Sequence, residues 1–188
     1  MGNNANYVSA AKPKVADAIY RAPLGTTLPT DAISALDAAF KALGYVSEDG
    51  LTNSNSSDSD TIVSWDGDTV LTVEGDKSDT FKFKLLEVLN VDVLKSVYGD
   101  ENVSGDLTTG IIVKANSDPK ESSSWAVDMI MNGGVLKRIV IPNAKLSELA
   151  DIVYKKNDAV GYDMTLSAVP DSAGNTHYEY ITKPSLSA

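Results

Sequence analysis

The sequence predicts a mostly β protein, a sandwich or an open barrel of about eight strands with one or two short helices. Three observations carry this prediction. The β-branched runs are short and separated by turn residues, several of them alternate apolar with polar side chains, and helical spacing occurs in only two places. The length of 188 residues fits one domain, 1–188, without a linker.

The first residues predict an arm followed by a strand. Residues 1–12 are polar and rich in Asn, so we expect an N-terminal arm that lies outside the core. Residues 14–22 alternate weakly and predict the first strand. The opening residues lack the charged and apolar stretches of a secretory signal, and no apolar run is long enough to span a membrane, so we expect neither feature.

A short helix is predicted between Pro29 and Gly44. Its apolar residues are spaced by four and three, as on one helical face, and Asp31 can cap its first turn. Gly44 is a natural stop at its C-terminus. The apolar positions are Leu36, Phe40 and Leu43.

A bare, acidic stretch follows. Residues 53–60 contain no apolar side chain, and residues 46–79 hold nine acids against the single Lys77, a net −8 of the chain's total of −10. Residues 53–60 cannot order themselves by burying apolar area, so we expect them to be mobile unless a partner orders them. The negative net charge argues against a grip on nucleic acid or on an anionic membrane.

Three strands are predicted next. Residues 61–65 and 69–74 are rich in β-branched side chains and flank the turn Asp66-Gly67-Asp68, so we expect them to be neighbours. Residues 79–87 alternate cleanly, which is typical of a half-buried strand. The expected buried positions of this strand are Phe81, Phe83 and Leu85.

The clearest helical pattern lies between Asn90 and Gly99. Apolar residues recur there at helical spacing, Asn90 can cap the first turn, and Gly99 can end the last one. Residues 107–115 return to strand character.

Asn132-Gly133 predicts a hairpin between residues 125–131 and 135–141. A two-residue turn sets Asp128 opposite Lys137, which favours this register by an ion pair. Both faces of the pair are apolar, so both need cover. We expect Trp125, Val127 and Met129 on one face, and Ala126, Ile130 and Ile139 on the other. A last hairpin is predicted from residues 159–169 and 176–182 around the turn 170–175.

The sequence contains no catalytic motif that we can identify, so we expect no enzyme, no cofactor and no metal. There is no cysteine, and His177 is interpreted as an ordinary surface residue. The pairs Asp58-x-Asp60 and Asp66-x-Asp68 offer oxygens to calcium but lack the order of a calcium-binding loop, so we interpret them as solvated acids. Trp65 and Trp125 are interpreted as core or interface residues rather than as sugar-stacking platforms.

Five segments of the sequence together resemble the major tail tube protein of siphophages that infect actinobacteria. They are LGYVSEDGLT (43–52), WDGDTVLT (65–72), DTFKFKLLEVLNVDVLKSVYG (79–99), KRIVIP (137–142) and DSAGNTHYEYI (171–181). The resemblance runs in the same order over nearly the whole chain.

The resemblance implies a structural virion protein. Its subunits form hexameric rings that stack into a non-contractile tube, and strands of each subunit join a continuous inner β-barrel through which genomic DNA passes without specific binding. Tail tip or initiator, tape measure and tail terminator proteins are the implied partners, and assembly takes place in the host cytoplasm. Contacts between rings are implied for the arm 1–12, for a long loop that corresponds by position to residues 47–61, and for the C-terminal tail 183–188.

These implications define three sets of candidate residues. Contacts between rings are expected from Asn53, Asn55, Asp58 and Asp60. Acids of the lumen or of an interface are expected at Asp66, Asp68, Glu74, Asp76 and Asp79. Apolar positions of the core or of a subunit interface are expected at Trp65, Trp125, Met129 and Ile139. The alternative is a monomeric β-sandwich module for binding or adhesion, dependent on calcium.

Overall fold

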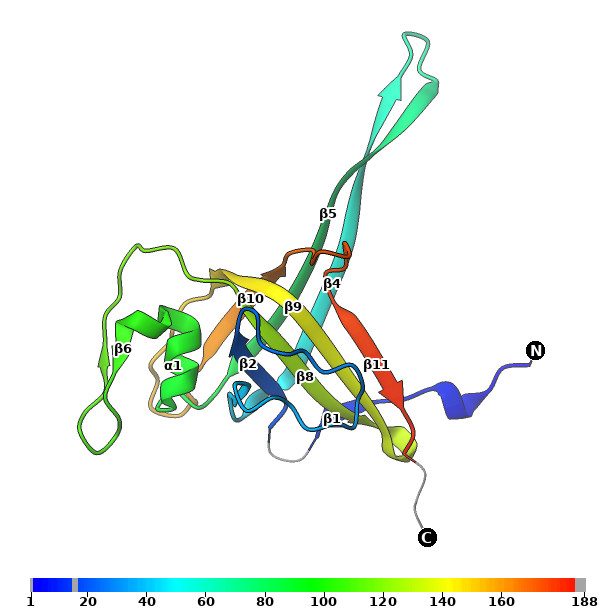
Figure 1. Cartoon of the computed structure of the whole chain (residues 1–188). Helices are drawn as coiled ribbons and strands as arrows, with labels where there is room; N and C mark the ends of the chain where they lie inside the picture. Colours follow the sequence, from blue (N-terminus) through cyan, green and yellow to red (C-terminus); the bar gives the residue numbers. More distant parts are fainter. Residues whose placement is uncertain (1, 15–16, 185–188) are drawn as a thin grey trace.

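A computed structural model describes residues 2–14 and 17–184 of the chain, and it is mostly β, as the sequence predicts (Figure 1). Within these residues it has eleven strands, more than the eight expected, one α-helix and three short 3-10 helices. The strands are β1 (Ala11–Pro13), β2 (Ile19–Pro23), β3 (Lys41–Ala42), β4 (Val46–Val63), β5 (Thr69–Leu85), β6 (Val103–Ser104), β7 (Ile112–Val113), β8 (Ser123–Met131), β9 (Val135–Leu149), β10 (Tyr162–Ala168) and β11 (Tyr178–Thr182). The helices are α1 (Val91–Tyr98), η1 (Ala5–Tyr7), η2 (Asp100–Asn102) and η3 (Asn132–Gly134).

Nine strands form one antiparallel sheet in the order β3-β2-β8-β9-β10-β5-β4, with β1 on β8 and β11 on β9. The strands β3 and β4 are at opposite ends of this order, yet β3 ends at Ala42 and β4 begins at Val46. Only three residues therefore connect the two edges, and the sheet curls round on itself as an open barrel. The remaining strands, β6 and β7, form a separate pair.

The main core lies inside this curled sheet. Alternate residues of β5 point into it as predicted, and α1 closes it with Val93 and Val97. The buried residues include Phe81, Phe83 and Leu85 of β5, Trp125 and Val127 of β8, Ile139 and Ile141 of β9, and Met164 and Leu166 of β10.

The helix predicted after Asn90 is confirmed as α1. The side chain of Asn90 accepts a hydrogen bond from the backbone N–H of Asp92 at 3.0 Å, and Gly99 follows the last turn with a φ of 97°. Both ends therefore use the capping chemistry that the sequence indicates.

The helix predicted between Pro29 and Gly44 is wrong. The described chain makes turns there, because its carbonyl groups have other partners: Arg138 Nη1 donates to the carbonyls of Asp31 and Ser34 at 3.1 and 2.8 Å. Asp31 does accept from the backbone N–H of Ser34, as an N-cap would, but the turn does not propagate. Side-chain bonds to the backbone have replaced the helical ladder.

The same segment covers the second face of the β8–β9 pair. Phe40 and Ala126 are both buried in a small cluster that also contains Ala22, with Leu28 and Leu36 packed against it. Part of the cover that the apolar faces require therefore comes from the chain itself.

The β8–β9 hairpin is confirmed, but its register differs from the prediction by one residue. The turn has three residues, and Gly133 and Gly134 both adopt positive φ, 72° and 74°, which other residues rarely do. Asp128 consequently lies opposite Arg138, and Ile139 lies opposite Val127. Ile139 therefore shares the face of Trp125, not the face of Ala126.

The last predicted hairpin is wrong. Strands β10 and β11 do not pair with each other; both pair with β9, at Leu146 and at Val140 for example, and both run antiparallel to it. They are two parts of one interrupted strand, and residues 169–177 are an excursion between them.

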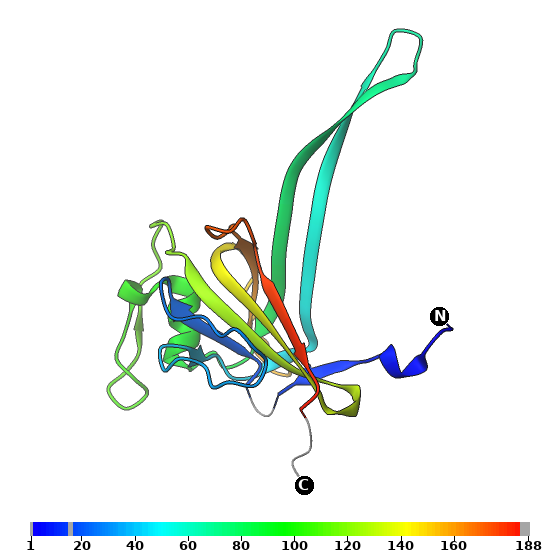
Figure 2. The same cartoon turned by 45° about the vertical axis from the view of Figure 1, so that its right-hand side comes forward.

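Three further predictions need correction. The bare stretch within 47–61 is not a loop but belongs to β4, which pairs with β5 in a long hairpin (Figure 2). The arm is shorter than 1–12, because Ala11 and Lys12 pair with β8. Of residues 107–115, only Ile112–Val113 form a strand. The predicted C-terminal tail falls mostly outside the described residues, since 185–188 are not among them.

Candidate assembly surfaces

The most prominent surface is a projection formed by residues 52–78, which we call the hairpin arm. It consists of the outer parts of β4 and β5 and the turn 64–68, and it extends well beyond the body of the molecule (Figures 1 and 2). Every residue of the hairpin arm is exposed except Ser64, which is half-buried. The arm therefore has no core of its own.

The tip of the hairpin arm is apolar. Trp65 is fully exposed, with a relative exposure of 105%. The turn is fixed around it, since Ser64 Oγ accepts from the N–H of Asp68 and donates to Asp66, and the hydroxyl and backbone bonds lower the pKa of Asp66. The other exposed apolar residues near the tip are Ile62, Val63, Val70, Leu71 and Val73. An exposed apolar cluster of this kind in an ordered turn is a candidate interaction surface.

The acids expected at the lumen or at an interface mostly lie on this arm. Between residues 52 and 78 there are six acids and one lysine, a net charge of −5. Asp58, Asp60, Asp66, Asp68, Glu74 and Asp76 are all exposed. In the part of the chain that the structure describes, no three acidic or histidine side chains come together as a metal site.

Asp79 differs from the other acids, because it is buried, with a relative exposure of 2%. It accepts hydrogen bonds from Asn53 Nδ2 at 2.7 Å and from Thr176 Oγ1 at 2.6 Å, and it contacts His177 Nδ1 at 2.6 Å. Burial raises the pKa of Asp79, but the bonds from Thr176, Asn53 and His177 outweigh it and hold the pKa below its ordinary value of 3.8.

Two sequence interpretations change with this cluster. Asn53, expected at a contact between rings, is bonded to Asp79 within the subunit, whereas Asn55 lies exposed opposite Asp79. His177 is not an ordinary surface histidine, since its side chain is only 16% exposed. A sequence signal for this contact is lacking, because Asp79 and His177 are 98 residues apart.

The four apolar candidates, Trp65, Trp125, Met129 and Ile139, differ in how far they are exposed to solvent. Trp125 and Ile139 belong to the core, with 2% and 4% exposure, and Met129 is half-buried against it. Of the four, only Trp65 is fully exposed.

A groove of about 490 Å³ lies at the other end of the body, away from the tip of the hairpin arm. It is bordered by β1, by the beginning of β4 and by β8. Its lining is mainly apolar and includes Ala18, Ile19, Leu51, Val127 and Met129, with Lys12, Glu48 and Asp49 as charged residues.

The N-terminal residues before β1 form a second projection (Figure 2). Tyr7 and Val8 are 87% and 75% exposed. Ser9 Oγ accepts a hydrogen bond from the backbone N–H of Asn132 at 2.7 Å and so joins this segment to the β8–β9 turn.

These features define a β-structured protein with an exposed hairpin arm, a projecting N-terminal segment and an apolar groove. A family model described as phage tail tube protein matches residues 1–188. The chain therefore belongs to the phage tail tube protein family, and its role is that of a structural component of a phage tail, which assembles into a tube with other tail proteins. No curated protein matches the chain. No helix among the described residues has the length and apolar character needed to cross a membrane.

Proposed function

We propose that six copies of this protein form a ring, and that the rings stack into a hollow, non-contractile tube that conducts genomic DNA from the capsid to the host. The phage is a siphophage with an actinobacterial host, and assembly takes place in the cytoplasm of that host. The tail tip or initiator complex, the tape measure protein and the tail terminator are the partners.

One observation carries this proposal: the hairpin arm is a pair of strands with free edges. Strand β4 ends the sheet order, and β5 pairs with β10 only from Thr80 inward, so residues 69–79 of β5 have β4 as their sheet partner. Free edges present unpaired backbone N–H and C=O groups that readily pair with another chain. Neighbouring arms can satisfy these groups in a ring, which yields the continuous inner barrel.

The length of the arm supports contacts between rings. From Thr52 to Val63, β4 rises about 3.3 Å per residue, so the arm extends for roughly 40 Å. Such a projection reaches beyond its own ring and brings Trp65 to the next one. Asn55, Asp58 and Asp60 lie along its length and are the proposed polar contacts, together with the N-terminal arm and the C-terminal tail.

The negative charge supports passage of DNA. Six copies at −10 each carry −60, and a protein that binds duplex DNA instead neutralises its phosphates with Lys and Arg. Acids on the hairpin arms that face the lumen therefore repel the cargo and let it slide.

A symmetric truncation tests the proposal. Residues 56–78 are replaced by Asn-Gly, which closes the hairpin at the observed pair Asn55 and Asp79. The truncated protein is expected to fold, because the removed residues contribute no buried side chain, and to form no tubes with the initiator complex in negative-stain microscopy. The control, Ser57→Ala, keeps the arm, changes an exposed residue that is not among the proposed contacts, and is expected to form tubes. Tubes of normal length from the truncated protein would refute the role of the arm.

A further inference from the structure

The hairpin arm leaves the body at a defined point. Strand β5 pairs with β10 from Leu85, opposite Tyr162, to Thr80, opposite Ser167. Asp79 is the next residue outward and pairs with Asn55 of β4. Any rotation of the arm relative to the body has to occur here, where support from β10 ends.

A buried carboxylate occupies this point. Asp79 accepts from Asn53 on the neighbouring strand, and it bonds to Thr176 and His177 from a segment about a hundred residues later. Bonds to an ionised carboxylate are shorter and stronger than bonds between neutral groups, and the distances of 2.6–2.7 Å agree with that. The cluster thus connects both strands of the hairpin to another part of the chain.

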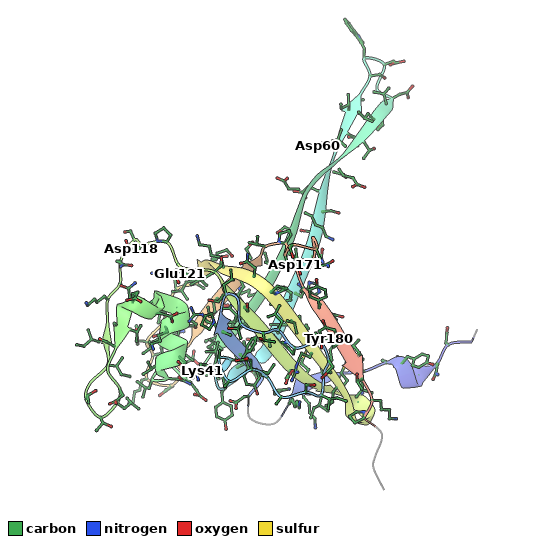
Figure 3. The ribbon with its side chains drawn as sticks, in the orientation of Figure 1. Lys41, Asp60, Asp118, Glu121, Asp171 and Tyr180 are labelled. Atoms are coloured by element: carbon green, nitrogen blue, oxygen red, sulfur yellow. The ribbon has the colours of Figure 1, made fainter. Side chains whose placement is uncertain are left out.

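That other part is residues 169–177, the excursion between β10 and β11, which we call the strap. Its shape is fixed internally: Asp171 accepts from the N–H groups of Ala173 and Asn175, and from the hydroxyl of Tyr178. Its first residue donates a backbone bond to Asn143, and β11 holds its other end on β9. Figure 3 shows Asp171 beside the base of the hairpin arm and Asp60 farther out.

His177 also contacts the core through Phe81. Its ring meets the ring of Phe81 edge to face, with centroids 5.3 Å apart at 87°. Phe81 is fully buried in the core. The histidine is therefore held between the core and the carboxylate of Asp79.

We propose that Asn53, Asp79, Thr176 and His177 form a lock that fixes the direction in which the hairpin arm projects. This goes beyond the proposed function, because it concerns the conformation of the single subunit. The arm acts as a lever: its ten residues beyond Asp79 span roughly 33 Å, so that a rotation of about 10° at the lock moves the tip by about 6 Å. A displacement of that size exceeds the length of a hydrogen bond, which is about 3 Å. Without the lock, the strand edges and the tip of the arm would therefore point in many directions.

Amide hydrogen exchange and X-ray scattering of the unassembled full-length protein test the lock. Asp79→Asn keeps one acceptor oxygen and turns an NH2 group either toward Asn53 or toward Thr176 and His177, so at least one of these bonds is lost. Exchange at residues 53–57 and 76–80 is expected to increase by about tenfold, with a broader distribution of molecular dimensions. Exchange in β8 and β9 is expected to stay unchanged. Asp60→Asn makes the same chemical change on an exposed residue of the arm and should match the wild type.

Two outcomes would overturn the lock. Exchange in Asp79→Asn equal to that of the wild type would show that the cluster does not hold the arm, and an equal increase in β8 and β9 would show a general structural role instead. Since neither measurement requires assembly, failure of the lock is distinguishable from failure of ring formation.

Variants at His177 sharpen the test and replace Asp79→Asn if that protein does not fold. His177→Asn keeps a donor near the position of Nδ1 and is expected to retain slow exchange in the arm. His177→Leu keeps bulk but removes the donor and is expected to loosen the arm. Equal exchange in the two variants would show that the hydrogen bond is not the lock.

Discussion

Arg138 is a buried charge that joins two layers of the protein. Its Nε and Nη2 donate to the two carboxylate oxygens of Asp128 at 2.6 and 2.8 Å, while Nη1 donates to the carbonyls of Asp31 and Ser34. The bonds to Asp128 raise the pKa of Arg138. Both side chains are at most 6% exposed, and a fork of this shape cannot be reproduced by lysine.

Removal of this fork is expected to destabilise the protein strongly. Arg138→Ala leaves Asp128 buried without its main partner, which typically costs about 3–5 kcal/mol. The free energy of unfolding in urea measures the effect. The control is Lys137→Ala on the same strand: its bond to Glu179 is partly exposed, and the expected loss is below about 1 kcal/mol. Equal losses in the two variants would contradict the prediction.

Asp79 is expected to make the protein sensitive to acid. Because its pKa is lower in the folded protein than the ordinary 3.8, its contribution to stability is present above pH 3.8 and is lost as the pH falls through the folded pKa. His177 is the histidine that contacts it, and the charged residues nearest in sequence on the adjoining segments are Lys77, Asp171 and Glu179.

The difference between wild type and Asp79→Asn isolates this group. Stability is measured by urea denaturation from pH 2 to 6, and the difference is expected to be constant at high pH and to shrink below pH 3.8. The comparison is needed because other carboxyl groups also have lowered pKa values: Asp31, at about 2, and Asp66, Asp106 and Asp171. If the difference in unfolding free energy between wild type and Asp79→Asn did not depend on pH, Asp79 would not be the source of the acid sensitivity.

At the scale of elements, local signals predicted α1 and the inner part of β5. The cap at Asn90 and the alternation of Phe81 and Phe83 depend on neighbours in the sequence, so the sequence alone sufficed. The helix expected near Leu36 failed because Arg138, about a hundred residues away, takes the carbonyl groups of that segment. Long-range hydrogen bonds overrode local periodicity there.

The candidate surfaces were predictable to a similar extent. The turn at Trp65 could be recognised from its acids and glycine, and the neighbouring strands were correctly paired. The rest of β4 was not predicted as a strand, because its serine and aspartate residues show no apolar alternation. Backbone pairing with β5 orders this stretch without burying its side chains. The cluster of Asp79 and His177 depends on the path of β10 and β11 along β9, which no local pattern encodes.

The N-cap of α1 gives a prediction at this scale. Asn90→Ala removes the acceptor for the N–H of Asp92 and is expected to lower the free energy of unfolding by about 1 kcal/mol. Asn90→Ser keeps an acceptor at the cap without placing a second carboxylate against Glu87, to which Asn90 Nδ2 donates, and should recover most of this loss. Thermal unfolding measures both, and an unchanged stability of Asn90→Ala would show that the core contacts of Val93 and Val97 hold the helix alone.

At the scale of the whole molecule, the surfaces lie at opposite ends. The apolar tip around Trp65 is at one end, and the groove beside Met129 and β1 is at the other. When one end of a subunit binds the other end of an identical subunit, each contact leaves a free end for the next copy. Such contacts form a closed ring only if the rotation between successive subunits brings the last one back to the first, and otherwise they generate an open filament. This polarity agrees with the proposed stacking of rings into a tube.

The charge of the assembled subunits predicts how salt affects the tube. Copies of the chain at −10 each repel one another, and salt reduces this repulsion because the screening length falls to about 10 Å at 0.1 M. Raising the salt from about 0.01 to 0.15 M is therefore expected to speed tube growth, measured by light scattering with the initiator complex. Replacing Asp66, Asp68 and Asp76 by Asn should make growth less dependent on salt.

Duplex DNA should not sediment with the tubes even at the lowest salt, where attraction to a basic surface is strongest. Retention of DNA under that condition would contradict an acidic lumen.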